Sequence, residues 1–179
     1  AVEQEAPMTF TPDANFPLIN MEKGRLCGEI DAHYVADTRL PYIASVDCGL
    51  KSNIIPETAE AVVVGMTKGE VQNYVEIASL ATNTKFTVTN DNGAIRILCK
   101  GVSGHAAMPE TANNALTALL GLLATLPCAD SEGFRKLQEL QQLFPHGDYH
   151  GKALGVAMED NIAGKLTLSA NIVHIDETD

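Results

Sequence analysis

The hydrophobic positions of this chain repeat with a period of two in several stretches, which predicts β-strands. Between residues 85 and 100, Phe86 and Val88 alternate with threonines before the pair Asn92-Gly93, which favours the type I′ turn of a β-hairpin. Strand-favouring residues also dominate 42–66. Strands are expected over 42–66 with a break at 53–56, and over 85–90, 94–100, 153–158 and 165–175.

Other stretches have the period of an α-helix. Thr67 and Glu70 fit a capping box, so a helix is expected to begin there and to end near Thr82. Two more helices are expected over 111–126 and 131–143. Strand pairs interspersed with helices predict an α+β fold, in which an antiparallel sheet carries helices on one face in a ferredoxin-like arrangement.

Charge and composition exclude several partners. The 12 basic and 23 acidic residues give a net charge of −11, and no basic cluster offers a surface for nucleic acid or for an anionic membrane. The longest apolar stretch, 115–126, is shorter than the roughly 18 residues that a membrane span needs. The first residues lack the pattern of a signal peptide, so we expect a cytoplasmic protein.

The four cysteines, Cys27, Cys48, Cys99 and Cys128, have no C-x-x-C spacing. We expect them to be reduced thiols, and two disulfides in an exported protein are the alternative. Cys99 and His105 do not form a nucleophile and base, because Cys99 falls in the middle of a predicted strand.

His105 is the most suggestive candidate for chemistry. It lies in a loop between a predicted strand and a helix, among small residues, where it can donate to or accept from a ligand. The triplets His146-Gly-Asp148 and His174-Ile-Asp176 are weak candidates for metal ligands. Asp13 is bracketed by prolines and by itself is typical of a turn. The residues alone therefore indicate no complete active site.

Three stretches taken together resemble one family. They are Phe-Thr-Pro-Asp-Ala-Asn-Phe-Pro from Phe10, Asn-Ile-Ile-Pro-Glu-Thr from Asn53, and Gly-Val-Ser-Gly-His-Ala-Ala-Met-Pro-Glu from Gly101, followed by Asn114-Ala115. In order and separation they are similar to the PepV-like dinuclear zinc dipeptidases, within the aminoacylase- and carboxypeptidase-type metallopeptidases. Members of this family have a catalytic domain with two zinc ions and an inserted lid domain, also called the exopeptidase dimerisation domain.

The resemblance implies roles for three residues. Asp13 matches a zinc-ligating aspartate, His105 a lid histidine that stabilises the oxyanion of the transition state, and Asn53 a lid asparagine that helps to position the substrate. It also implies that 1–20 end a catalytic-domain segment and that 21–179 form a lid domain, incomplete at its C-terminus.

The remaining expectations concern partners. The other zinc ligands and the glutamate base are expected outside this chain, so we expect it to be inactive alone and to need the missing catalytic domain for dipeptide hydrolysis. We also expect a weak homodimer through an uncovered sheet edge or apolar face. The alternative is a stand-alone ferredoxin-like domain that senses a ligand or dimerises.

Overall fold

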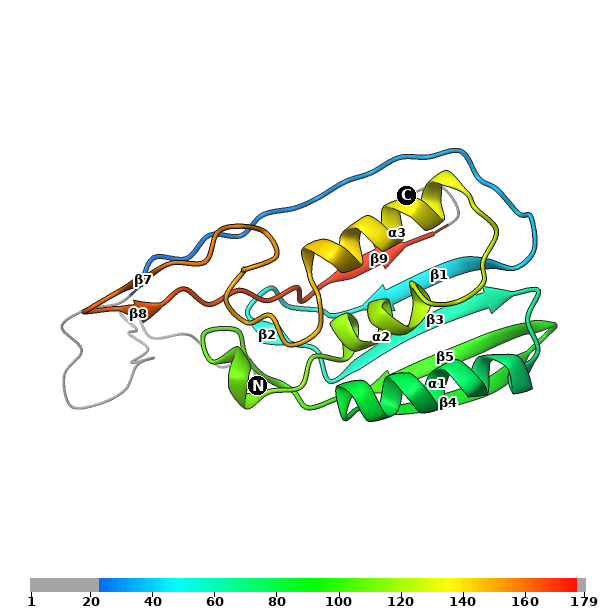
Figure 1. Cartoon of the computed structure of the whole chain (residues 1–179), viewed down its shortest axis with the longest axis horizontal. Helices are drawn as coiled ribbons and strands as arrows, with labels where there is room; N and C mark the ends of the chain where they lie inside the picture. The colour runs from blue at the N-terminus through cyan, green and yellow to red at the C-terminus, as the bar shows by residue number, and fades with distance from the viewer. Residues whose placement is uncertain (1–22, 177–179) are drawn as a thin grey trace, which may run out of the picture.

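A five-stranded antiparallel sheet forms the centre of the molecule (Figure 1), in a computed structural model that describes residues 23–176. Asp13 and most of the proline-rich beginning therefore lie outside the described residues. The strand order is β4-β5-β3-β1-β9. These strands are β1 (Tyr42–Cys48), β3 (Thr58–Val64), β4 (Lys85–Asp91), β5 (Ala94–Lys100) and β9 (Val173–Ile175).

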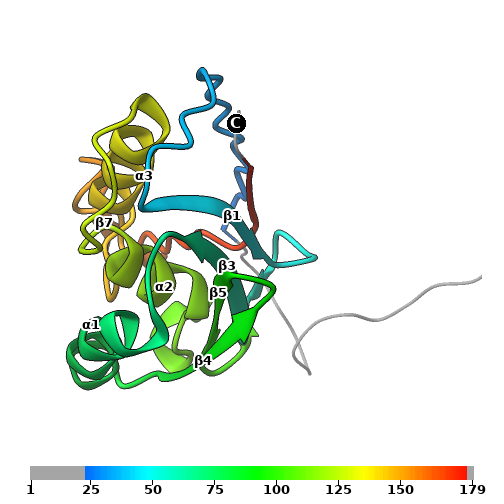
Figure 2. The ribbon, with the colours of Figure 1, turned by 90° about the vertical axis from the view of Figure 1, so that its right-hand side faces the viewer.

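Three α-helices cover one face of this sheet within the described range (Figure 2). They are α1 (Lys68–Thr82), α2 (Ala115–Leu123) and α3 (Glu132–Leu143). α2 is the central one, because it contacts α1, α3 and the strands β3 and β5. The predicted α+β fold, with helices on one face of an antiparallel sheet, is confirmed.

Local sequence signals account for several of these elements. The capping box is present: the Thr67 hydroxyl accepts the Glu70 amide, and the Glu70 carboxylate accepts the Thr67 amide at 2.7 Å. In the β4–β5 hairpin, Asn92 and Gly93 have φ values of 48° and 92°, as a type I′ turn requires. Both predictions are confirmed.

The core lies between the sheet and the helices. Alternate residues of β3 and β5 point towards it, and α2 is buried almost all round, as its apolar sequence predicts. The opposite face of the sheet is more polar, and there Arg96 pairs with Glu60 and, at 2.7 Å, with Asp91. The buried side chains of these elements include Ala59, Ala61, Val63, Ile95, Ile97, Leu116, Leu119, Leu120 and Leu123.

The second helix begins later than expected. A short 3₁₀-helix, η1 (Pro109–Thr111), precedes it, and α2 begins only after Asn114. The Asn114 side-chain oxygen accepts the amides of Leu116 and Thr117, so this residue is the N-cap.

The prediction of two long closing strands is wrong. Residues 153–158 contain no strand, and the short ribbon of β7 (Glu159–Asp160) and β8 (Gly164–Lys165) comes next, before β9. The amides of Leu166 and Leu168 donate to the loop carbonyls of Met158 and Tyr149 instead of to a long partner strand. Alternation of apolar residues in 166–172 therefore does not correspond to a strand here.

No helix between residues 23 and 176 is both long and apolar enough to cross a membrane.

Candidate functional site

Two of the predicted site residues lie together at a small two-stranded ribbon outside the main sheet, His105 within it and Asn53 directly before it. β2 (Ile54–Ile55) pairs antiparallel with β6 (Gly104–His105), and Ile54 stands opposite His105. At the end of the ribbon, the Ala106 amide donates to the Asn53 carbonyl at 3.0 Å. Residues quoted from two separate sequence stretches thus become neighbours in space. Their proposed roles stay predictions.

The His105 ring is exposed and has a defined tautomer. Its Nδ1 accepts the backbone amide of Ala107 at 3.1 Å. In the neutral ring a nitrogen that accepts a hydrogen bond carries no proton, so the proton resides on Nε2. His105 can therefore donate an N–H to an oxygen of a ligand.

Close backbone packing fixes the loop that carries His105. The amides of Val102 and Asn113 each donate to the carbonyl of the other, at 2.8 and 2.9 Å. The Ser103 hydroxyl donates to the Ile55 carbonyl at 3.0 Å. A Cβ on Gly104 would lie 2.7 Å from the Cβ of Ala112, so a larger residue there would displace the ribbon. The glycine directly before His105 is thus needed for packing.

The loop that carries Asn53 is held from the far end of the chain. The side-chain amide of Asn171 donates to the Ser52 carbonyl at 2.8 Å. The side-chain amide of Asn114 donates to the carbonyl of Ala170 at 2.8 Å. Neither contact was predicted from the sequence. The sequence could indicate Asn114 as a helix cap, since it directly precedes an apolar helical stretch. Asn171 lies in a stretch whose pattern predicts a strand, so nothing marks its contact.

The two H-x-D triplets are engaged in structural contacts. His146 Nδ1 lies 2.9 Å from the Thr117 hydroxyl, and His174 Nδ1 lies 2.9 Å from the Asp47 carboxylate. Burial opposes ionisation of Asp148, but hydrogen bonds from nearby backbone amides outweigh it and lower its pKa. Among residues 23–176, no three His, Cys, Asp or Glu side chains are grouped so that they could hold a metal ion.

The cysteines do not offer a nucleophile in the core. All four are described, and none forms a disulfide. Burial raises the pKa of Cys48 to about 12 and those of Cys99 and Cys128 to about 11. These thiols stay protonated at neutral pH, and a protonated thiol is a poor nucleophile.

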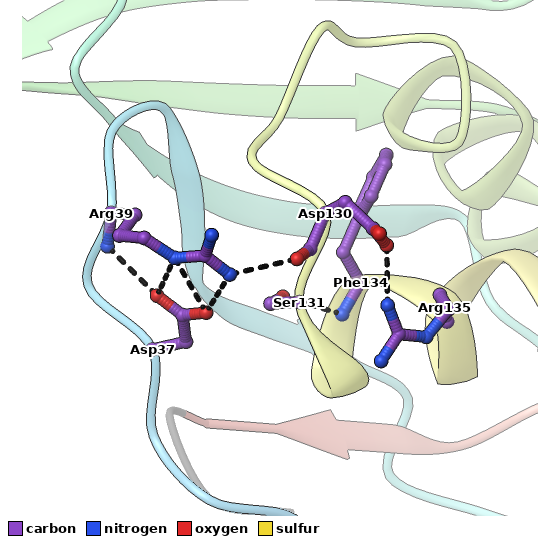
Figure 3. A network of polar contacts seen from close by, with 6 residues as sticks. All are labelled: Asp37, Arg39, Asp130, Ser131, Phe134 and Arg135. Atoms are coloured by element: carbon purple, nitrogen blue, oxygen red, sulfur yellow. Dashed lines mark hydrogen bonds and ion pairs between the residues drawn. The ribbon is translucent and has the colours of Figure 1, made fainter.

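A polar network ties the segment before β1 to the start of α3 (Figure 3). The Arg39 guanidinium binds the Asp37 carboxylate and donates to the Asp130 carbonyl at 2.8 Å, while Arg135 pairs with the Asp130 carboxylate. The hydrogen bonds from Arg39 lower the pKa of Asp37 to about 2. The network lies near the first residues of β1, whereas the β2–β6 ribbon follows the last residue of β1. We therefore assign the network a structural role.

Comparison with known proteins relates the chain to bacterial dipeptidases. No family model matches it. It is 32% identical, over 98% of its length, to the protein named putative dipeptidase YtjP of Bacillus subtilis. It is 26% identical, over 95% of its length, to the Beta-Ala-Xaa dipeptidase of Lactobacillus delbrueckii subsp. lactis. The chain spans only 38% and 36% of these two relatives.

Proposed function

We propose that this chain is the lid part of a longer dipeptidase and that His105 and Asn53 act on the bound dipeptide. Two findings support the proposal. The similarity to dipeptidases runs along nearly the whole chain but covers little more than a third of each relative. The β2–β6 ribbon joins the Asn53 and His105 segments and leaves the His105 ring exposed.

The observation that carries the proposal is the hydrogen bond that the His105 ring accepts at Nδ1. Because Nδ1 accepts the Ala107 amide, the proton of the neutral ring is assigned to Nε2, which can donate it to a substrate oxygen. Attack on a peptide carbonyl places negative charge on its oxygen, and a prepositioned donor stabilises that charge most in the transition state. In this proposal His105 is that donor, and Asn53 helps to hold the substrate.

Zinc dependence is proposed for the full-length protein only. Residues 23–176 do not fit a zinc site, because no three suitable ligands meet among them. Asp13 is proposed as one zinc ligand on the resemblance of its Thr-Pro-Asp-Ala segment, and it lies outside the described residues. The other ligands and the base would come from the catalytic domain, which is the proposed partner of this chain in a cytoplasmic enzyme.

The test compares two histidine variants of the full-length protein. We expect His105→Ala to lower kcat by roughly 10²- to 10³-fold, as the loss of one oxyanion donor does. The bound zinc, measured by atomic emission, should stay the same because His105 is given no metal role. His174→Ala removes another exposed histidine, on β9, and should leave kcat near that of the wild type.

Three outcomes would count against this assignment. A near-normal kcat for His105→Ala, or a loss of zinc in that variant, would refute the proposed role of His105. If the full-length protein released no amino acids from any dipeptide, the dipeptidase proposal itself would be wrong. The alternative of a ligand-sensing or dimerisation domain would then take its place.

A further inference from the structure

Asn171 is a buried amide that contacts the loop of the candidate site. It lies just before β9 and is only 8% exposed. Its side-chain nitrogen donates to the carbonyl of Ser52, the residue before Asn53, at 2.8 Å. A residue far along the chain thus fixes the backbone from which the Asn53 side chain extends.

The junction between these two segments is tight. Gly49 has a φ of +81°, and a Cβ at this position would lie 1.8 Å from the Asn171 carbonyl oxygen. The β1–β2 connection can therefore approach Asn171 only because residue 49 is glycine. Such close backbone contact leaves the loop little freedom to shift.

Asn114 forms a hydrogen bond with the residue that precedes Asn171. It caps α2 at the centre of the core, and its side-chain nitrogen donates to the Ala170 carbonyl at 2.8 Å. The contacts therefore run from α2 to Ala170 and Asn171, then to the loop of Asn53. From Asn53 they continue through the Ala106 amide to the ribbon that carries His105.

Only the nitrogen of the Asn171 side-chain amide forms a hydrogen bond within the described residues. Its Oδ1 is buried and has no hydrogen-bond partner among the described residues, while its nitrogen makes the bond to Ser52. A buried polar atom without a partner costs free energy. The hydrogen bond from the side-chain nitrogen to Ser52 then explains why residue 171 is an asparagine. An apolar side chain of similar shape would fill the space without leaving a buried oxygen unpartnered.

We infer that Asn171 is a positioning residue for dipeptide hydrolysis, acting through Asn53. It holds the Ser52–Asn53 backbone against the core, so that Asn53 and the ribbon of His105 keep a fixed relation to the substrate. The inference rests on the proposed function. Small displacements of a group that orients a substrate reduce the rate strongly. The hydrogen bond from Asn171 to Ser52, called the tether below, should therefore be detectable in kinetics.

The test is a double-mutant cycle in the full-length protein. Asn171→Leu keeps the branched shape and the number of heavy atoms of the side chain and removes the donor. We expect it to lower kcat/KM about 10-fold, mainly through a higher KM, because Asn53 is assigned to substrate positioning. In an Asn53→Ala background the same change should have less than about a twofold effect, since the tether then has nothing to position.

Tyr34→Phe is the matched control. It removes another hydrogen bond from a side chain to a distant backbone group, from the Tyr34 hydroxyl to the Asp176 carbonyl at 2.8 Å, beyond the other end of β9. We expect kcat/KM within about twofold of the wild type. Hydrogen exchange provides a second readout: peptides covering 50–55 should exchange faster in Asn171→Leu and unchanged in Tyr34→Phe.

The outcomes separate this inference from the proposed function. If Asn53→Ala lowers kcat/KM but Asn171→Leu behaves like Tyr34→Phe, the inference is wrong and the proposed function stands. Equal effects of Asn171→Leu in the wild-type and Asn53→Ala backgrounds would likewise overturn it, because they indicate a general loss of stability. If the full-length protein has no dipeptidase activity, the proposed function fails first, and the exchange of 50–55 still tests the tether.

Discussion

The imidazole of His146 contributes to the fold as a neutral group. Its Nδ1 lies 2.9 Å from the Thr117 hydroxyl at the start of α2, and its ring is partly buried. Burial lowers its pKa below the ordinary value of 6.5, against a smaller opposing effect of a backbone hydrogen bond at Thr82. Protonation in the folded state is therefore less favourable than in the unfolded chain.

This shift predicts a loss of stability in mild acid. Well above pH 6.5 both states are neutral at His146, and its full contribution is present. As the pH falls below that value the unfolded state takes up the proton first, so the free energy of unfolding decreases until the folded state also titrates. Urea unfolding between pH 7.5 and 5.5 measures this. His146→Gln should show a weaker pH dependence, and an identical slope in both proteins would contradict the prediction.

The sequence could indicate some residues of the site and not others. Asn53 and His105 each lie in a recognisable stretch, and the hydrogen bonds of β2–β6 bring those stretches together. The contact of Asn171 with Ser52 joins residues 119 positions apart, with nothing in the local sequence to mark it. An unremarkable asparagine in a strand-like stretch carries no signal of a partner so distant.

At the scale of the element, the capping box gives α1 a measurable share of the stability. Thr67→Ala removes the hydroxyl that accepts the Glu70 amide, so we expect the free energy of unfolding to fall by about 1 kcal/mol. Urea denaturation of the two proteins measures the difference. Lys68→Ala, in the first turn and exposed, is the control and should change the stability much less. Equal losses in both variants would show that the cap contributes little.

Elements with local signals were predictable, and those that depend on distant partners were not. The β4–β5 hairpin, α1 and α3 follow their caps, turns and periods to within a residue or two. The ribbon of β2 and β6 has two residues in each strand, too few for any periodicity. Residues 153–158 contain no strand, and the strand predicted over 165–175 is present only at Lys165 and at 173–175. Between these, the amides of Leu166 and Leu168 donate to loop carbonyls, which the local sequence could not indicate.

At the scale of the whole molecule, we propose that the catalytic domain supplies the other zinc ligands and the base. This predicts that the purified 179-residue chain hydrolyses no dipeptide, with or without zinc. Residues 23–176 group no three metal ligands, and Asp13 alone would supply a single one where a zinc site needs three or four. Release of amino acids from a panel of dipeptides measures this, with the full-length protein as the positive control. Zinc-dependent activity that survives purification and is lost in His105→Ala would refute it.

The edge of the sheet at β4 predicts a weak homodimer of the chain. β4 is the last strand on its side of the described sheet, and Ile77 and Leu80 of the neighbouring α1 are 70% and 88% exposed. Open edges and apolar patches favour association, whereas the net charge of −11 opposes it. Sedimentation over a hundredfold range of concentration should show a reversible shift that Leu80→Glu removes. A strict monomer throughout would contradict the prediction.

The tether between Asn171 and Ser52 also has a consequence for synthesis on the ribosome. The β4–β5 hairpin joins neighbouring residues and can close as soon as they emerge, whereas contacts between distant residues form late. The loop of Asn53 leaves the ribosome long before the residue that fixes it, 119 positions later. We therefore expect nascent chains released before residue 171 to contain the hairpin, while the loop of Asn53 still lacks its contact with Asn171. The proposed site would then be complete only after residue 171 has been translated.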